Sequence, residues 1–144
     1  MSKIRTDHVD SLTRSAIMRA VKNRRVKSTE LALRARLVAA GVRGWRMYAK
    51  ALPGTPDFVF EANKVAVFVH GCFWHGCPRC YRRPRSSRSY WDDKVARNRA
   101  RDLRVEAQLR RRGWRVIRFW ECDLQAKTAA RIMRHLRNIL HGRG

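Results

Sequence analysis

DFVFEANKVAVFV, residues 57–69, carries the clearest structural signal in this sequence. Two runs of β-branched and aromatic residues flank the polar tetrapeptide EANK, and this pattern predicts a β-hairpin. The turn signal PGTP, residues 53–56, comes just before it, so that Asp57 opens the first strand and His70 closes the second. Because the strands of a hairpin are antiparallel, we expect Asp57 and His70 at the same end.

A helix is predicted before the hairpin. Ser28 or Thr29 can cap its first turn, and Gly41 supplies the stop. Its apolar face would consist of Leu31, Ala35, Leu37 and Val38. Residues 2–27 are basic, with apolar positions at roughly helical spacing, which indicates a further short amphipathic helix.

Three elements are predicted after the hairpin. A basic loop, residues 82–89, leads into a highly charged helix over residues 92–112, which we expect either to be solvated or to face DNA. A strand over residues 114–120 and a last helix around residues 129–140 complete the chain. The order α, α, β, β, α, β, α predicts an α/β fold with a mixed sheet flanked by helices, in a single domain.

The charge of the chain points to a polyanionic partner. Lys and Arg number 34 against 11 Asp and Glu in 144 residues, which gives a formal net charge of +23. Such an excess repels itself in a compact chain unless a polyanion is nearby, and nucleic acid is the obvious one. The longest apolar run, residues 65–69, is far too short to span a membrane. The N-terminal residues lack the apolar core of a signal peptide, so we expect a cytoplasmic location.

The cysteines predict a metal site. Cys72, Cys77 and Cys80 have the spacing C-x4-C-x2-C, and Cys122 follows the last predicted strand, where a neighbouring strand can return it to the other three. In a reducing compartment such cysteines are more readily metal ligands than disulfides. Tetrahedral zinc takes four thiolates, and a site closed by four protein ligands is structural. The alternatives are four buried, reduced cysteines, or a site in which His75 replaces one thiolate.

A second set of residues has the functional groups that phosphodiester hydrolysis needs: Glu30, Asp57, His70, His75 and Asp102. That reaction needs a divalent ion to neutralise charge on the phosphate, and groups that transfer protons. A carboxylate beside two imidazoles supplies both. Each carboxylate also has a purely local interpretation: a turn cap for Asp57, a favoured first-turn position for Glu30, and pairing with nearby arginines for Asp102.

Four segments of the chain resemble the very-short-patch repair (Vsr) endonucleases: TRSAIMRAV, LPGTPDFVF, VFVHGCFWHGCPRCY and GWRVIRFWECDL, between residues 13 and 124. The resemblance implies a restriction-endonuclease-like fold, a structural zinc ion and magnesium-dependent nicking of one DNA strand. It further implies that the substrate is a T·G mismatch left by deamination of 5-methylcytosine, and that the enzyme is functionally linked to a cytosine-5 DNA methyltransferase. A monomer is expected, since a nick needs one active site.

The resemblance also implies a role for each residue of the catalytic set. Asp57 and the main-chain carbonyl of Val69 would hold the catalytic Mg²⁺. His75 would transfer the proton, and Asp102 would fix the tautomer of its ring. The remaining members would support the water structure and the phosphate: His70 and Glu30. The structural Zn²⁺ would be held by the four cysteines.

Three aromatic residues, Phe73, Trp74 and Trp91, would form a wedge that enters the base stack beside the mismatch. Unstacking costs less at a mispaired base, and a stacked aromatic ring repays roughly 1 to 3 kcal/mol per base. Alternatively, Phe73 or Trp74 is a core residue covering the metal, since neighbours in an extended segment point to opposite faces.

The basic segment of residues 1–27, with Ile17 and Met18, resembles the part of the family that clamps DNA from the other groove; the alternative is a solvated arm. Residues 28–144 would then form the zinc-containing endonuclease domain. Two other functions stay open on the sequence alone. One is cutting of fully paired, sequence-defined DNA in restriction or defence, and the other is a non-catalytic zinc module that binds DNA.

Overall fold

A computed structural model describes residues 16, 19 and 29–142 and shows an α/β fold built on one four-stranded sheet. Its elements are a helix of residues 29–39, β1 (Arg46–Met47), β2 (Phe58–Phe60), η2 (Glu61–Asn63), β3 (Val65–His70), α2 (Arg88–Arg111), β4 (Arg115–Trp120), η3 (Glu121–Leu124) and α3 (Ala126–Leu140). The strand order is β1-β2-β3-β4. Antiparallel pairing joins β1, β2 and β3, and parallel pairing joins β3 and β4, so the predicted mixed sheet is confirmed.

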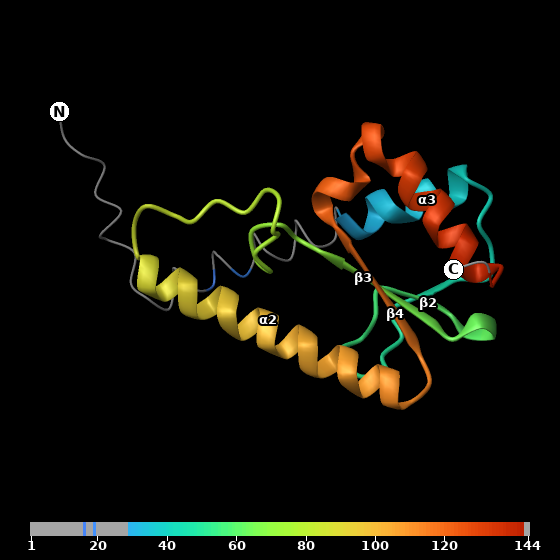
Figure 1. Cartoon of the computed structure of the whole chain (residues 1–144), viewed down its shortest axis with the longest axis horizontal. Coiled ribbons are helices and arrows are strands. Elements are labelled where there is room, and N and C mark those ends of the chain that lie inside the picture. Colours follow the sequence, from blue (N-terminus) through green and yellow to red (C-terminus); the bar gives the residue numbers. More distant parts are fainter. Residues whose placement is uncertain (1–15, 17–18, 20–28, 143–144) are drawn as a thin grey trace.

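Helices cover both faces of this sheet (Figure 1). One face packs against the helix of residues 29–39 and α3 in a core to which β3 and β4 contribute Val65, Val67, Val69, Ile117 and Phe119. The other face packs against the C-terminal half of α2 and contributes Ala66, Phe68 and Val116. Successive residues of a strand point to opposite faces, so His70, the next residue after Phe68 on that face, lies on the α2 side.

The hairpin predicted over residues 57–69 is confirmed. Its register pairs Phe58 with Val67 and Phe60 with Val65, and η2 connects the strands. All three residues of β2 are buried, because both faces of the sheet are covered at this point. The antiparallel register brings Asp57 to the end of β3, where the main-chain N–H of Val69 reaches its side chain.

The observed elements differ from the predicted ones in three places. The predicted apolar face of the helix of residues 29–39 is wrong: Leu31, Ala35 and Val38 are exposed, whereas Leu33 and Leu37, four residues apart on one side of the helix, face the core. The charged helix begins at Arg88 and not at Asp92, and the short strand Arg46–Met47 was not predicted. A strand of two residues is too short to show an alternating pattern, so its pairing with β2 is visible only in the fold. Within the segment of residues 1–27, the structure describes only residues 16 and 19, and the predictions for Ile17, Met18 and a separate clamping segment lie outside the described residues.

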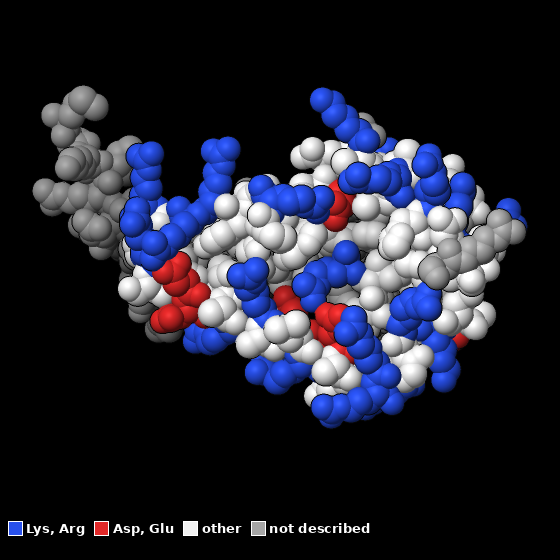
Figure 2. All heavy atoms as spheres, viewed as in Figure 1, with Lys and Arg blue, Asp and Glu red and all other residues white. Residues whose placement is uncertain are grey.

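Basic side chains spread over the whole visible face in Figure 2, with few acidic side chains between them. Some of the acidic side chains of the described residues are paired with arginines, as in the contacts of Arg83 with Asp92 and of Arg118 with Glu106. None of the helices in the described part of the chain combines the length and the apolar character needed to cross a bilayer. The surface therefore offers a large unneutralised positive charge to a polyanion.

Gly54, in the turn before β2, packs against α2 too closely to accept a side chain. Its φ is +72°, and a Cβ at this position would lie 2.4 Å from Cγ1 of Val105. Left-handed backbone costs a residue with a Cβ roughly 1 to 2 kcal/mol, and overpacking typically adds about 1 to 3 kcal/mol. We expect Gly54→Ala to lower the free energy of unfolding by about 2 kcal/mol or more, measured by chemical denaturation.

Gly41→Ala is the matched control, because Gly41 has a φ of +68° and nothing lies within 4 Å of a Cβ placed there. It measures the backbone cost alone, so the difference between the two variants measures the overlap with Val105. Val105→Ala should accordingly cost less in the Gly54→Ala background than in the parent. Equal destabilisation by the two alanine substitutions would contradict the proposed contact.

Candidate active site and cysteine cluster

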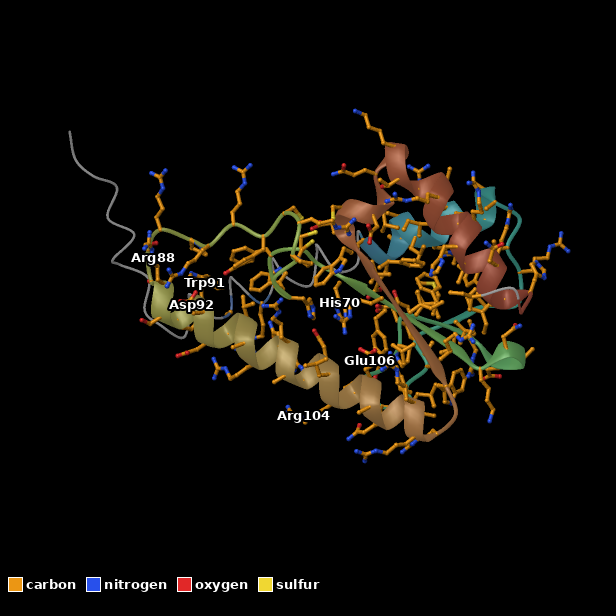
Figure 3. All side chains as sticks on the ribbon, viewed as in Figure 1. His70, Arg88, Trp91, Asp92, Arg104 and Glu106 are labelled. Atoms are coloured by element: carbon orange, nitrogen blue, oxygen red, sulfur yellow. The ribbon has the colours of Figure 1, made fainter. Side chains whose placement is uncertain are left out.

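A pocket of about 390 Å³ opens between α2 and the face of the sheet that α2 covers. Figure 3 shows His70 and Glu106 in this space between the sheet and α2. Four of the five predicted catalytic residues line the pocket: Asp57, His70, His75 and Asp102. The fold therefore brings together residues from the position just before β2, from β3, from the loop after β3 and from α2.

His75 and Asp102 make a short hydrogen bond, 2.6 Å between Nδ1 and Oδ2. Although burial raises the pKa of Asp102, the hydrogen bond from His75 and the charges of nearby groups hold it below its usual value. The ionised carboxylate accepts the Nδ1 proton, which leaves Nε2 of a neutral His75 ring unprotonated. A ring held in this tautomer can take up a proton at Nε2 and return it.

His70 stacks on His75, with ring centroids 4.0 Å apart and planes 12° from parallel. Burial, followed by the neighbouring His75, lowers the pKa of His70 to about 3, so this ring is neutral at neutral pH. Its Nδ1 lies 3.7 Å from Oδ2 of Asp102, which is too far for a hydrogen bond. His70 therefore fixes the plane of the His75 ring by packing.

The ligand atoms of His70, His75 and Asp102 lie within 4.8 Å of one another, close enough for a metal ion. The orientation of the rings argues against one. An imidazole binds a metal through a lone pair in the plane of its ring, at about 2.1 Å. An ion bound to both stacked rings would lie between them, out of both planes. The geometry therefore favours proton transfer for this group.

Asp57, which lines the pocket, and Glu30, which does not, form a pair of interacting carboxyl groups. Oδ2 of Asp57 accepts the N–H of Val69 at 2.7 Å, and Glu30, in the first turn of the helix of residues 29–39, is 6% exposed. Burial, opposed by the Val69 hydrogen bond and reinforced by Glu30, raises the pKa of Asp57 to about 8. Among the described residues, neither carboxylate has an ion pair with Lys or Arg.

Two adjacent, poorly solvated carboxyl groups gain most from a divalent cation, which takes the place of the missing positive charge. Hard oxygen ligands of this kind suit Mg²⁺ better than softer metals. The main-chain carbonyl of Val69 belongs to the residue that binds Asp57, so a third oxygen lies nearby. The residues therefore fit the predicted magnesium site.

The four cysteines also converge, because the loop after β3 meets η3. Their sulfur atoms all lie within 4.8 Å of one another, and the structure contains no disulfide. Sγ of Cys77 and Sγ of Cys122 are 3.8 Å apart, which matches the edge of a tetrahedron with metal–sulfur bonds of about 2.3 Å, about 3.8 Å. Burial raises the pKa of Cys77, but hydrogen bonds from the backbone N–H groups of Arg79 and Cys80 outweigh burial and lower this pKa to about 7.

The donor set therefore fits a closed tetrahedral thiolate site, as predicted for zinc. The alternative in which His75 replaces a thiolate does not fit, because the four sulfurs already lie together, while His75 is grouped with His70 and Asp102. A closed site with four protein ligands has no position for a substrate. The cluster is accordingly separate from the pocket, although the same loop supplies both.

The three aromatic residues predicted to contact DNA form one cluster. The ring centroid of Phe73 lies 5.1 Å from the ring centroid of Trp74 and 5.1 Å from that of Trp91. Trp74 is only 4% exposed, and its carbonyl accepts a hydrogen bond from Nδ2 of Asn98 at 2.8 Å. Phe73 and Trp91 are half-buried. In this structure the core alternative therefore applies to Trp74, and the accessible part of the cluster is Phe73 with Trp91.

Several residues near the site were missed in the sequence. Arg101, Glu106 and Arg118 line the pocket, and Tyr48 donates its hydroxyl to Oε2 of Glu30 at 2.6 Å. That hydrogen bond, with burial and the nearby negative charges, raises the pKa of Tyr48 to about 12, so its hydroxyl stays protonated. Arginines fill the predicted helix, and no spacing distinguishes Arg101 and Glu106 as the members that face the pocket. Arg118 lies in the predicted strand, one of its two arginines. Tyr48 follows the short strand β1, which the sequence did not reveal.

Comparison with known proteins finds one family and several relatives. The model of the family described as DNA mismatch endonuclease Vsr matches residues 6–82. The type II nicking enzyme V.XorIIP of Xanthomonas oryzae pv. oryzae is 43% identical over 137 residues, which cover 94% of this chain and 97% of that enzyme. The type II nicking enzyme V.NaeI of Lentzea aerocolonigenes is 40% identical over 117 residues, 78% of this chain and 70% of that enzyme. The DNA mismatch endonuclease Vsr of Escherichia coli K12 is 38% identical over 120 residues, 82% of this chain and 75% of that enzyme.

Cys122→Ser should release the metal from the cysteine cluster. We expect the parent to contain about one equivalent of zinc and to lose several kcal/mol of stability on chelation, because binding to a tetrathiolate site contributes to folding. The variant should contain substoichiometric zinc, melt at a lower temperature and respond little to chelator. Metal analysis and thermal unfolding with and without chelator measure both effects.

Thr128→Ala is the control for damage near η3 that does not involve the metal. The hydroxyl of Thr128 donates to the carbonyl of Asp123 at 2.9 Å, next to Cys122 in the chain. Its loss should reduce stability by about 1 kcal/mol and leave the zinc content and the response to chelator unchanged. A full equivalent of zinc in Cys122→Ser would contradict the site.

Proposed function

The chain belongs to the family of the DNA mismatch endonuclease Vsr and is an endodeoxyribonuclease, and we propose that it nicks one strand of duplex DNA beside a T·G mismatch. Such mismatches arise when 5-methylcytosine deaminates. The observation that supports this function best is the pocket that Asp57 lines together with the His75–Asp102 pair, while the loop that carries His75 and the helix α2 that carries Asp102 also supply an aromatic cluster. Membership of an endonuclease family sets aside the non-catalytic DNA-binding module.

In the proposed reaction Asp57 and the main-chain carbonyl of Val69 would hold Mg²⁺, and Glu30 would support its water. The ion would neutralise charge on the phosphate and make a bound water more acidic. Oδ2 of Asp57 is fixed by the N–H of Val69, which leaves the other carboxylate oxygen for the ion. The buried position of both carboxyl groups keeps the site poorly solvated, where electrostatic contacts with a phosphate are strongest.

Proton transfer is assigned to Nε2 of His75. The unprotonated nitrogen accepts a proton from the attacking water or, once protonated, gives it to the leaving oxygen. Asp102 stabilises the imidazolium that forms, and the stacked ring of His70 prevents His75 from rotating away. The pocket thus contains groups for both the charge and the proton of phosphodiester hydrolysis.

Mismatch recognition is assigned to Phe73 and Trp91, the accessible rings of the aromatic cluster. They would enter the base stack, which is less costly to open at a T·G pair. Trp74 supports them from below, since it is buried and contacts both rings. The same proposal includes four further points: a DNA-clamping role for residues 1–27, a monomeric state, a functional link to a cytosine-5 DNA methyltransferase and a restriction-endonuclease-like fold.

A second candidate function is supported by the names of the relatives. V.XorIIP and V.NaeI are type II nicking enzymes, and both match this chain at least as closely as the Escherichia coli mismatch endonuclease does. In that function the same pocket would nick fully paired DNA at a defined sequence, as part of restriction or defence. The two candidates share the chemistry and differ in the substrate.

A nicking assay on matched duplexes separates the two. We expect magnesium-dependent cleavage of one strand in duplexes with a T·G pair, in a panel of flanking sequences, and little cleavage of the paired duplexes. Asp57→Ala should bind T·G DNA with nearly the affinity of the parent and lose roughly a thousandfold or more in nicking rate, since several kcal/mol of charge stabilisation are removed. Preferential nicking of paired DNA would establish the second candidate, and retained nicking by Asp57→Ala would contradict the assignment of the pocket.

His75→Ala and Asp102→Asn should act as one unit. Each is expected to reduce the nicking rate by about 10² to 10⁴-fold, and the double variant should lose no more than His75→Ala alone, because Asp102 acts through the His75 ring. Single-turnover rates, with enzyme in excess over DNA and saturating magnesium, measure the effect. His135→Ala is the control, because His135 is exposed on α3. Additive losses in the double variant would show that Asp102 acts independently of His75.

A further inference from the structure

Tyr48 is connected to both carboxyl residues of the proposed magnesium site. Its hydroxyl donates to Oε2 of Glu30 at 2.6 Å, and its main-chain N–H donates to the carbonyl of Asp57 at 3.1 Å. Glu30 belongs to the helix of residues 29–39, whereas Asp57 directly precedes β2, so the two carboxyl groups come from different elements. A single residue bonded to both restrains their relative position.

The backbone of Tyr48 has an unusual conformation that serves this connection. Its φ is +56°, in the left-handed region that residues with a Cβ rarely adopt. The N–H of Ala49, the next residue, donates to the carbonyl of Pro56 at 3.3 Å, so backbone contacts with the segment before β2 continue past the end of β1. A conformation of this kind persists only where the surrounding contacts hold it, and such residues concentrate at functional sites.

The hydroxyl satisfies one oxygen of a carboxylate that has little access to water. Glu30 is 6% exposed, and among the described residues it has no ion pair with Lys or Arg. A hydrogen bond to Oε2 fixes the rotation of the carboxylate, and with it the position of both carboxylate oxygens relative to Asp57. Hydrogen bonds to the groups around a metal typically change its affinity by about 10 to 100-fold.

We propose that Tyr48 is a positioning residue, which sets the Glu30 carboxylate relative to Asp57 so that the pair binds a divalent cation. The inference rests on the proposed function for the identity of the reaction, but ion binding can be measured without DNA. Tyr48 itself contacts no reacting group. Its contribution should therefore appear in the affinity for the ion and not in the rate at saturating ion.

Tyr48→Phe removes only the hydroxyl. We expect the dissociation constant for Mg²⁺, measured by calorimetry without DNA and checked with Mn²⁺ by electron paramagnetic resonance, to rise about tenfold. The magnesium concentration for half-maximal nicking should rise by the same factor, while the rate at saturating magnesium stays within about twofold of the parent. Tyr90→Phe is the matched control, because Tyr90 is exposed to a similar extent, 47% against 44%, and lies on α2.

Two further variants separate positioning from a general structural role. Tyr48→Gly removes the hydroxyl but accepts a positive φ without strain, so it should fold and still bind the ion weakly. In a Glu30→Gln background, Tyr48→Phe should have little further effect on ion affinity, because the hydroxyl acts through Glu30. Parental ion affinity in Tyr48→Phe, or a full additional loss in the Glu30→Gln background, would overturn the inference.

Failure of the inference and failure of the proposed function give different results. If the parent nicks T·G duplexes and Tyr48→Phe keeps the parental affinity for Mg²⁺, the role of Tyr48 is wrong and the function stands. If the parent binds Mg²⁺ and Tyr48→Phe weakens that binding, but no T·G duplex is nicked, the function is wrong and the role of Tyr48 stands.

Discussion

The parallel pairing of β3 with β4 positions both the cysteine cluster and the pocket. Parallel strands need a long crossover, and α2 supplies it. The register places His70 opposite Trp120, so the two strands end together and the loop after β3 meets η3. The crossover packs on one face of the sheet and carries Asp102 to the side of His75. One pairing therefore fixes where the cysteines converge and where the catalytic groups meet.

The pocket gathers groups that are unfavourable to bury. Asp57 and Glu30 lie side by side without a basic partner among the described residues, and the raised pKa of Asp57 records the cost of ionising it there. The chain has 34 basic side chains, yet none that the structure describes forms an ion pair with these two. A Lys or Arg there would stabilise the fold and occupy the place of a cation. The destabilising pair is thus consistent with a site kept open for a metal ion.

The elements predicted correctly from the sequence are those whose residues carry a local pattern of apolar and polar positions. The hairpin over residues 57–69 was predicted because apolar runs and a polar turn are unambiguous. The start of α2 was missed because Ser87, its N-cap, has a φ of +55° and makes no side-chain cap bond, so the usual capping signal is absent. The contact of Tyr48 with Glu30 depends on a two-residue strand and a left-handed residue, neither of which has a sequence signature.

The candidate site, like the fold, could be predicted from the sequence only in part. The residue types and the cysteine spacing could be recognised in the sequence, and the convergence of the cysteines was expected because Cys122 follows the last predicted strand. The burial of Trp74 was one of two open alternatives, and only packing against α2, through Asn98 and the other two rings, distinguishes them. That packing has a functional consequence. Phe73 lies between Cys72 and His75 in the chain, so a metal that fixes Cys72 and Cys77 also fixes the distance between the ring that would probe the bases and the ring that would transfer the proton. A loop held at both ends in this way would cut at a constant distance from the base pair it recognises, whichever substrate it takes.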